Sequence, residues 1–186
     1  DNILFFTNKG KVYQLKGYDI PEASRIAKGT AIINLLPLDS EEKVEVIMPI
    51  NKFEDDYYLL MSTTLGMIKK TKLTEYSSVR KSGIIAINLK DNDKLIDVKL
   101  TNGNSKIILV TRNGKAITFE ETDVRETGRS SQGVIGIKLL KDDTVIGMDT
   151  YTDLKDNTLL AITESGFGKR TELEEYRIQK RGGTGV

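Results

Sequence analysis

The sequence contains no cysteine, no histidine and no tryptophan, and only three prolines among its 186 residues. Without cysteine there is no disulfide, no thiolate nucleophile and no cysteine-based zinc site. Without histidine, the commonest general base and transition-metal ligand are also missing. No stretch approaches the ~18 consecutive apolar residues of a membrane-spanning helix. We therefore expect this chain to have no catalytic residue, metal site, cofactor or membrane contact. The lack of cysteine and of an N-terminal secretion signal favours the cytoplasm.

What the sequence does contain is an internal repeat, the first feature to look for in any chain. The segments "LFFTNKGKVYQLKGYDI", "LMSTTLGMIKKTKLTEY", "ILVTRNGKAITFEETDV" and "LAITESGFGKRTELEEY" align on a Thr-x-x-Gly pattern. Each is followed by a second glycine that precedes an apolar stretch, as in "KSGIIAINL". The aligned glycines of the first set are Gly10, Gly66, Gly114 and Gly166, and those of the second set are Gly29, Gly83, Gly133 and Gly182.

A third shared element, such as "KVEVIMPI" or "KLIDVKL", closes the first three repeats after an acidic turn. We predict a single domain over 1–186, with repeats at approximately 1–56, 57–104, 105–156 and 157–186, the last of them incomplete.

Each repeat has the pattern of β-strands joined by tight turns. In the second repeat, "YYLLMST" and "MIKKTKL" flank a glycine turn, and two shorter apolar strands follow. Four strands per ~50 residues are typical of a propeller blade. One blade cannot bury its own faces, so neighbouring blades must bury them for each other. The fold class expected is all-β, with helix scarce.

The stretch "GKVYQLKGYDIPEASRIAKGTAIINLLPL" resembles the C-terminal DNA-wrapping domain of the bacterial DNA gyrase A subunit, and "GFGKRTELEEYRIQKRGGTGV" resembles a later repeat of it. The resemblance implies a β-pinwheel, in which four-stranded blades exchange strands with their neighbours. Six blades are usual in that family, so about four here imply an internal fragment, with blades missing before Asp1 and after Val186.

The resemblance also implies a function. The domain would bend double-stranded DNA round a basic rim, without catalysing a reaction, so that the holoenzyme can introduce negative supercoils. Its protein partners would be the rest of the gyrase A subunit, together with the gyrase B subunit in an A2B2 heterotetramer. The cleavage tyrosine and the sites for ATP and Mg would lie elsewhere, and the setting would be the bacterial cytoplasm, at the nucleoid. The alternatives are a protein-binding β-propeller and the C-terminal domain of the topoisomerase IV A subunit.

The end of the chain resembles a short motif of the same family, the gyrase A box Gln-Arg-Arg-Gly-Gly-Lys-Gly. Two positions depart from that motif, at Lys180 and Thr184, and the segment follows three repeats rather than preceding them. We interpret it as a box-like connection of the fourth repeat, with a wrapping role as the alternative. The box-like residues are Gln179, Lys180, Arg181, Gly182, Gly183, Thr184 and Gly185.

Charge is distributed unevenly along the repeats. From each Thr-x-x-Gly turn to the second glycine, over residues 8–29, 66–83, 112–133 and 166–183, the net charge is +3, +4, 0 and +2, whereas the whole chain carries +1. The third repeat is neutral because acidic residues, Glu121 among them, offset its bases. Stacked repeats would gather the bases into a band that binds phosphate without reading sequence. Any single lysine is equally typical of a solvated loop, but the repeated pairs Lys69–Lys70 and Lys169–Arg170 favour DNA contact. The predicted DNA-binding residues are Lys9, Lys11, Arg25, Lys28, Lys69, Lys70, Lys72, Arg80, Lys81, Arg112, Lys115, Arg129, Lys169, Arg170, Arg177, Lys180 and Arg181.

Overall fold

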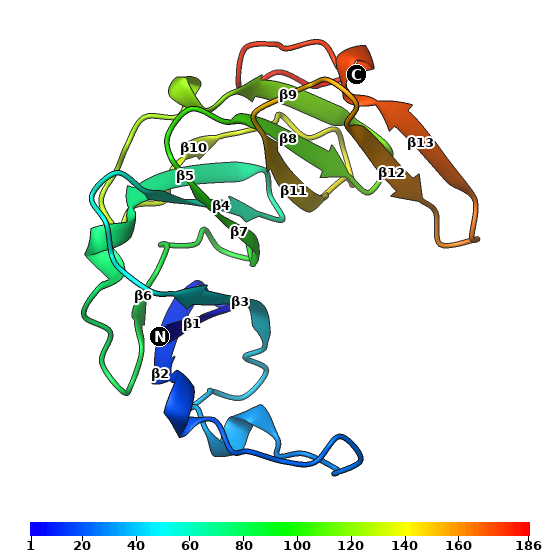
Figure 1. Cartoon of the computed structure of the whole chain (residues 1–186). Helices are drawn as coiled ribbons and strands as arrows, with labels where there is room; N and C mark the ends of the chain where they lie inside the picture. Colours follow the sequence, from blue (N-terminus) through cyan, green and yellow to red (C-terminus); the bar gives the residue numbers. More distant parts are fainter.

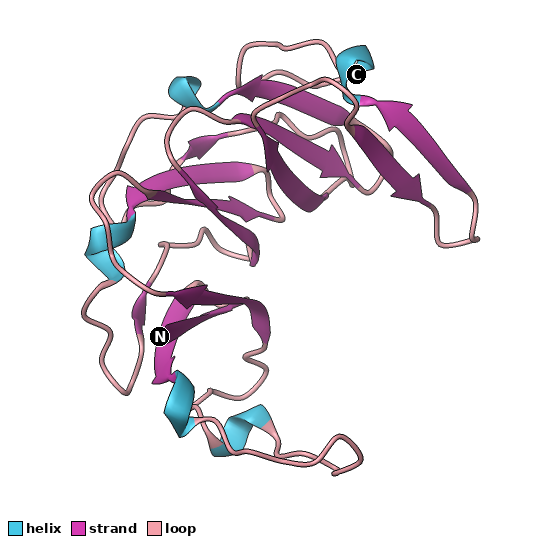
Figure 2. Ribbon diagram, viewed as in Figure 1, coloured by secondary structure: helices cyan, strands magenta, loops and turns pink.

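The computed structural model describes all residues, 1–186, and confirms the all-β fold class (Figures 1 and 2). The strands are β1 (Asn2–Thr7), β2 (Lys11–Lys16), β3 (Val44–Ile50), β4 (Tyr58–Thr63), β5 (Met67–Lys72), β6 (Ile84–Ile85), β7 (Leu95–Thr101), β8 (Lys106–Thr111), β9 (Ala116–Glu120), β10 (Val134–Ile135), β11 (Val145–Tyr151), β12 (Thr158–Ile162) and β13 (Gly168–Glu172). The helical segments are short 3-10 turns, η1 (Gly17–Asp19), η2 (Ile32–Asn34), η3 (Leu73–Tyr76), η4 (Glu121–Asp123) and η5 (Leu173–Glu175). None of these turns has the length or the apolar character to span a bilayer.

The strands form four antiparallel sheets that follow one another along an open arc (Figure 1). We call them blades 1 to 4. Blade 1 has the order β3-β1-β2-β6, blade 2 the order β7-β4-β5-β10, blade 3 the order β11-β8-β9, and blade 4 only β12-β13. Strands β3, β7 and β11 lie on the concave side of the arc, whereas β6, β10 and β9 lie on its convex side (Figure 1).

Neighbouring repeats exchange strands, as the family resemblance implied. Strand β6 belongs to the second repeat but pairs with β2 of the first, with Val12 opposite Ile84. Strand β10 of the third repeat pairs with β5 of the second in the same way. Blades 1 and 2 therefore each take their outermost strand from the repeat that follows, and successive blades are joined through hydrogen bonds as well as through packing.

The Thr-x-x-Gly pattern is explained by the turn that joins the first two strands of each repeat. In the second repeat the Gly66 N–H donates to the carbonyl of Thr63 at 3.1 Å, and the Met67 N–H donates to the hydroxyl of Thr63 at 3.2 Å. Gly66 has a φ of 86°, a conformation that side chains disfavour. The same glycine accepts, through its carbonyl, the N–H groups of Gly136 and Ile137 that follow β10. The turn thus also fixes the exchanged strand.

The two large hydrophobic clusters lie between blades, whereas a smaller one, of Phe5, Tyr13 and Leu36, lies within the first repeat. One buried cluster joins Leu4 and Phe6 of blade 1 to Leu59 and Tyr76 of the second repeat. A second cluster occupies the corresponding place between blades 2 and 3. This arrangement confirms that the blades bury one another's faces.

Blade 4 stands at the end of the arc with both edges unpaired (Figure 1). Leu160 of β12 is 61% exposed, whereas Ile108, its counterpart in blade 3, is 1% exposed. Ile108 lies on the face of blade 3 that blade 4 covers, whereas no further blade covers Leu160 in this structure. The difference shows how much of a blade's burial comes from the blade packed on its face.

Candidate nucleic-acid interface

The fourth repeat joins blade 3 through the last residue of the chain. Val186 exchanges two backbone hydrogen bonds with Ala116 of β9, at 2.8 and 2.9 Å. Val134 pairs with Ile68 at the same position of blade 2. Val186 is therefore the counterpart of Val134, and the two connections can be compared residue by residue.

This comparison corrects the alignment of the second glycine. Gly185 precedes the docked residue, just as Gly133 does, and both have a positive φ, of 73° and 82°. A Cβ on either would collide with the backbone of the strand beneath, at Ala116 or Ile68. The expectation that Gly182 fills this position is wrong. Two glycines three residues apart both matched the sequence pattern, and only the strand pairing separates them.

Two arginines occupy equivalent positions four residues before these glycines. The guanidinium of Arg129 donates through Nη1 to the carbonyl of Ile85 at 2.6 Å. The guanidinium of Arg181 donates to the carbonyl of Ile135 and, through Nε, to that of Asp123 at 2.9 Å. Each arginine is thus held on the exchanged strand of the preceding repeat. A guanidinium has five N–H donors, so donors remain for an anion on the convex side.

A groove of about 460 Å³ opens beside Arg129, next to the exchanged strand β6. We call it the outer groove. It contains three cationic side chains, two hydroxyls and no carboxylate. Its lining residues are Lys11, Ser78, Arg80, Ser82, Gly83, Ile84, Ile85 and Arg129. Positive charge beside serine hydroxyls suits a phosphate group. The serines were missed by the sequence analysis, because nothing in the sequence shows that residues 78–83 fold against β2.

The outer groove has a smaller counterpart at the next blade junction. A hollow of about 240 Å³ is lined by Asp123, Lys180 and Arg181. It contains a carboxylate, and its net charge is accordingly lower. Of the two places, the outer groove is the stronger candidate for an anion.

Lys69, which was expected to contact DNA directly, is buried inside blade 2. It is 0% exposed, and its ammonium group donates to the carbonyls of Ala86 and Arg129. Burial lowers the pKa of Lys69 to about 7, with Glu75 opposing the shift and Arg129 adding to it. The prediction of direct phosphate contact is therefore contradicted for this residue.

Lys70 is buried as well, at 8% exposure. Its Nζ lies 3.3 Å from the carbonyl oxygen of Glu121 and 5.2 Å from the centre of the Tyr58 ring. The Nζ of Lys72 lies 5.9 Å from the centre of the same ring, and Lys72 is half-buried. Lys70 is thus not placed on the surface either, because the connection of the third repeat covers the end of β5.

Lys9 and Lys11 contact the acidic turn of their own repeat. Lys11 Nζ pairs with the carboxylate of Asp39 at 3.0 Å, and Lys9 Nζ donates to the carbonyl of Ser40 at 2.8 Å. The hydrogen bond and charge of Lys11 hold the pKa of Asp39 below its usual range. Both lysines keep part of their surface exposed, so a phosphate would compete with these partners.

Blade 4 repeats the Lys69–Lys70 pattern in a different environment. Lys169 and Arg170 lie on β13 and are exposed. They follow Gly166 as Lys69 and Lys70 follow Gly66, but no strand pairs with the outer edge of β13. The remaining predicted residues are exposed or, for Lys115, half-buried; they are Arg25, Lys28, Arg80, Lys81, Arg112, Lys115, Arg177 and Lys180.

The box-like segment 179–185 crosses the junction between blades 2 and 3. The Gln179 N–H donates to the carbonyl of Thr118 at 2.7 Å, and the Gly182 N–H donates to that of Gly136 at 2.8 Å. Residues 127–133 make the equivalent connection one blade earlier. The segment therefore connects neighbouring blades. Its interpretation as a box-like connection without a wrapping role stays a prediction.

The surface of the third repeat is more positively charged than its sequence suggests. Glu121 is 0% exposed and accepts hydrogen bonds from the Thr101 hydroxyl at 2.5 Å and the Ser105 N–H at 2.9 Å. This carboxylate is an internal acceptor, so it does not offset surface bases as we expected. The position of Glu121 in the sequence, directly after β9, did not predict that its side chain is a buried hydrogen-bond acceptor.

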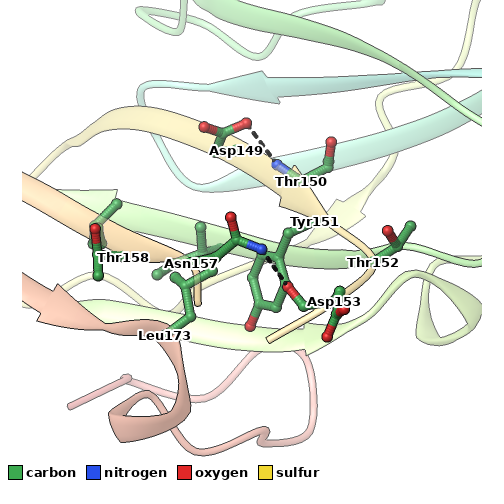
Figure 3. A pocket seen from close by; sticks show the side chains of 10 residues that line it. Asp149, Thr150, Tyr151, Thr152, Asp153, Asn157, Thr158 and Leu173 are labelled. Atoms are coloured by element: carbon green, nitrogen blue, oxygen red, sulfur yellow. Dashed lines mark hydrogen bonds between the residues drawn. The ribbon is translucent and has the colours of Figure 1, made fainter. Parts of the chain in front are cut away.

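A cavity of about 340 Å³ lies between blades 3 and 4 (Figure 3). Asp149 and Asp153 lie among its lining residues, and Asn157 donates to the carbonyl of Asp153 at 3.1 Å. With acidic side chains and no basic one, this cavity is unsuited to phosphate. This cavity is therefore not part of the candidate interface.

Four-stranded blades that take their outermost strand from the next repeat define a β-pinwheel, a repeat protein of the propeller type. A sequence model of the family described as DNA gyrase C-terminal domain, beta-propeller, matches residues 1–51, 57–102, 105–151 and 157–186. The chain belongs to this family.

Among curated relatives, the DNA gyrase A subunit of Clostridium acetobutylicum is 51% identical over the whole chain, and that of Buchnera aphidicola is 49% identical. The chain spans 22% of the length of each. Among solved structures, the C-terminal domain of DNA topoisomerase IV superposes with a TM-score of 0.93 at 36% identity, covering all of this chain and 58% of that one. The DNA gyrase A C-terminal domain gives a TM-score of 0.81 at 32% identity, with 100% and 59% covered.

Proposed function

We propose that this chain is a non-catalytic DNA-binding and DNA-wrapping region of a DNA gyrase A subunit. The observation that carries the proposal is the outer groove, with three cations and no carboxylate on the convex side of an arc. The relatives are named as A subunits of DNA gyrase, and that name supports double-stranded DNA as the ligand.

The mechanism follows from the stiffness of the duplex. Its persistence length is about 150 bp, so bending it sharply costs several kcal/mol. Phosphate contacts along a curved surface offset that cost, and they do so without base readout. Because the arginines recur at blade junctions, one arc can contact the backbone at intervals along the bend.

The proposal extends to the whole enzyme. The chain would act with the rest of the gyrase A subunit, together with the gyrase B subunit, in an A2B2 assembly in the bacterial cytoplasm. ATP, Mg and the cleavage tyrosine would be used outside this region. A duplex wrapped here would then reach the cleavage site with a fixed handedness.

The test is duplex binding as a function of salt. We expect the chain to bind a ~40-bp duplex with an affinity that falls steeply between about 50 and 200 mM salt. Arg80→Glu, in the outer groove, combined with Lys81→Glu next to it, should weaken binding at least tenfold and reduce the slope of the log–log plot by about 2. The matched control changes exposed lysines of two acidic turns, Lys90→Glu with Lys141→Glu, and should keep the slope. Equal losses of duplex affinity in the two variants would refute the assignment of the phosphate contacts to the outer groove.

The superposition on topoisomerase IV favours a second candidate, a domain that binds duplex without wrapping it. The two candidates are distinguished by incubating a relaxed plasmid with the chain and a nicking-closing enzyme, and then measuring the linking number of the closed plasmid. Wrapping changes the linking number after protein removal, whereas binding alone leaves it unchanged.

A further inference from the structure

Lys69 joins the second and third repeats at one atom, directly beneath the outer groove. Its Nζ donates to the carbonyl of Ala86, the residue that follows β6, and to the carbonyl of Arg129, which lines the groove. The Tyr76 hydroxyl donates to the same Ala86 carbonyl at 2.9 Å. The side chain itself comes from β5 of blade 2. The backbone that carries Arg129 and the exchanged strand are thus held by the same amine.

The surroundings of this amine are unusual for a lysine. It is fully buried, and no carboxylate forms an ion pair with it. The charged groups that act on it are Glu75 of η3, which favours its protonated form, and Arg129, which disfavours it. Burial dominates and lowers its pKa to about 7. An anion placed at Arg129 would offset the repulsion between the two cations.

We propose that Lys69 is a positioning residue of the outer groove, holding Arg129 and the exchanged strand for a DNA phosphate and gaining its proton when that phosphate binds. The inference rests on the proposed function, because it takes duplex DNA as the source of the phosphate. Lys69 does not touch the phosphate. It acts through the backbone of Arg129 and Ala86 and through its charge.

Coupling of this kind makes duplex binding take up a proton near neutral pH. The composition of the chain makes the effect measurable, because histidine and cysteine, which commonly titrate between pH 6 and 9, are absent. The terminal α-amino group is present in all variants, so its contribution to proton uptake cancels when the variants are compared.

The experiment measures the affinity of the chain for a ~40-bp duplex between pH 6 and 9 at fixed salt, with proton uptake followed by an indicator dye. If phosphate binding raises the pKa of Lys69 by about one unit, the wild-type affinity falls about tenfold across this range. Lys69→Met should bind more weakly at pH 6 and show no such fall. The matched control is Lys141→Met, an exposed lysine outside the groove, which should behave as wild type. In an Arg129→Ala background, Lys69→Met should weaken binding by less than it does in wild type, because the guanidinium that Lys69 positions is absent.

A titration of the Lys69 side chain by NMR, with and without duplex, tests the coupling without any substitution and therefore does not depend on how a variant folds. A midpoint that rises when DNA is added supports the inference. A midpoint that stays fixed, or a pH dependence that persists in Lys69→Met, overturns it while leaving the proposed function intact. Failure of the wild-type chain to bind duplex at any pH overturns both.

Discussion

Two glycine turns with the same backbone conformation provide a matched test of strand exchange. Gly66 and Gly114 have φ values of 86° and 84°. A Cβ at Gly66 would lie 2.7 Å from the carbonyl oxygen of Ile137, whereas a Cβ at Gly114 would have no atom within 4 Å. Replacing each by alanine therefore imposes the same backbone strain, but only Gly66→Ala pushes against the exchanged segment.

The expected losses follow from these contacts. The left-handed conformation costs an alanine about 1–2 kcal/mol, and this cost applies to both variants. The smaller conformational freedom of alanine in the unfolded chain also affects both equally. Gly66→Ala additionally disturbs the hydrogen bonds from Gly136 at 2.8 Å and Ile137 at 3.2 Å, worth about 0.5–1.5 kcal/mol each. We expect Gly66→Ala to lower the free energy of unfolding by about 2 kcal/mol more than Gly114→Ala.

Urea unfolding of the two variants, followed by circular dichroism, gives the difference, and hydrogen exchange gives its location. Amide protection should fall at Gly136 and Ile137 in Gly66→Ala, and should remain unchanged there in Gly114→Ala. Equal losses of stability, or unchanged protection at Ile137, would show that the exchanged strand does not depend on this turn, and the reasoning would be refuted.

Other substitutions test the buried polar groups. Glu121→Ala should destabilise the chain by about 2–3 kcal/mol in urea unfolding, because Thr101 and Ser105 lose their acceptor; a loss below about 0.5 kcal/mol would contradict this. Asp93→Ala should cost about 1–2 kcal/mol, since its carboxylate accepts from three groups around the second glycine turn; an unchanged urea midpoint would argue against that role. For Lys69 the folded-state pKa of about 7 lies below the ordinary value of 10.5. The unfolded chain therefore holds this proton to higher pH, and the unfolding free energy of wild type should rise relative to Lys69→Met by about 1 kcal/mol per unit between pH 7 and 10; a fall over that range would refute the assignment.

The sequence predicted local structure well because local rules decide it. Thr63 and Gly66 make their turn through hydrogen bonds within four residues of one another, so the same pattern reports the same turn in every repeat. The alternating glycines and apolar stretches likewise indicated where strands begin. The exchange itself was implied by the family resemblance alone, because a two-residue strand such as β6 has no periodicity of its own.

Burial of the lysines could not be predicted in this way. Lys69 and Lys70 lie in a stretch that reads as polar, and their surroundings are set by residues far along the chain. The carbonyl of Arg129 that Lys69 contacts is 60 positions away, and the carbonyl of Glu121 near Lys70 is 51 positions away. A basic pair repeated in the sequence therefore marks a repeated position, whose exposure depends on what covers the blade there.

The outer groove shows why charge counted repeat by repeat is a poor guide to the interface. Lys11 comes from the first repeat, Arg80 from the second and Arg129 from the third, so the groove exists only where three repeats meet. Counted over residues 112–133 the third repeat is neutral, yet it supplies the arginine that anchors the groove to the exchanged strand. Because strand exchange moves side chains of one repeat onto the blade of another, the junction between blades is the unit that could carry an anion site. Under the proposed function, affinity for duplex should therefore increase with the number of complete junctions and not with the net charge of the chain.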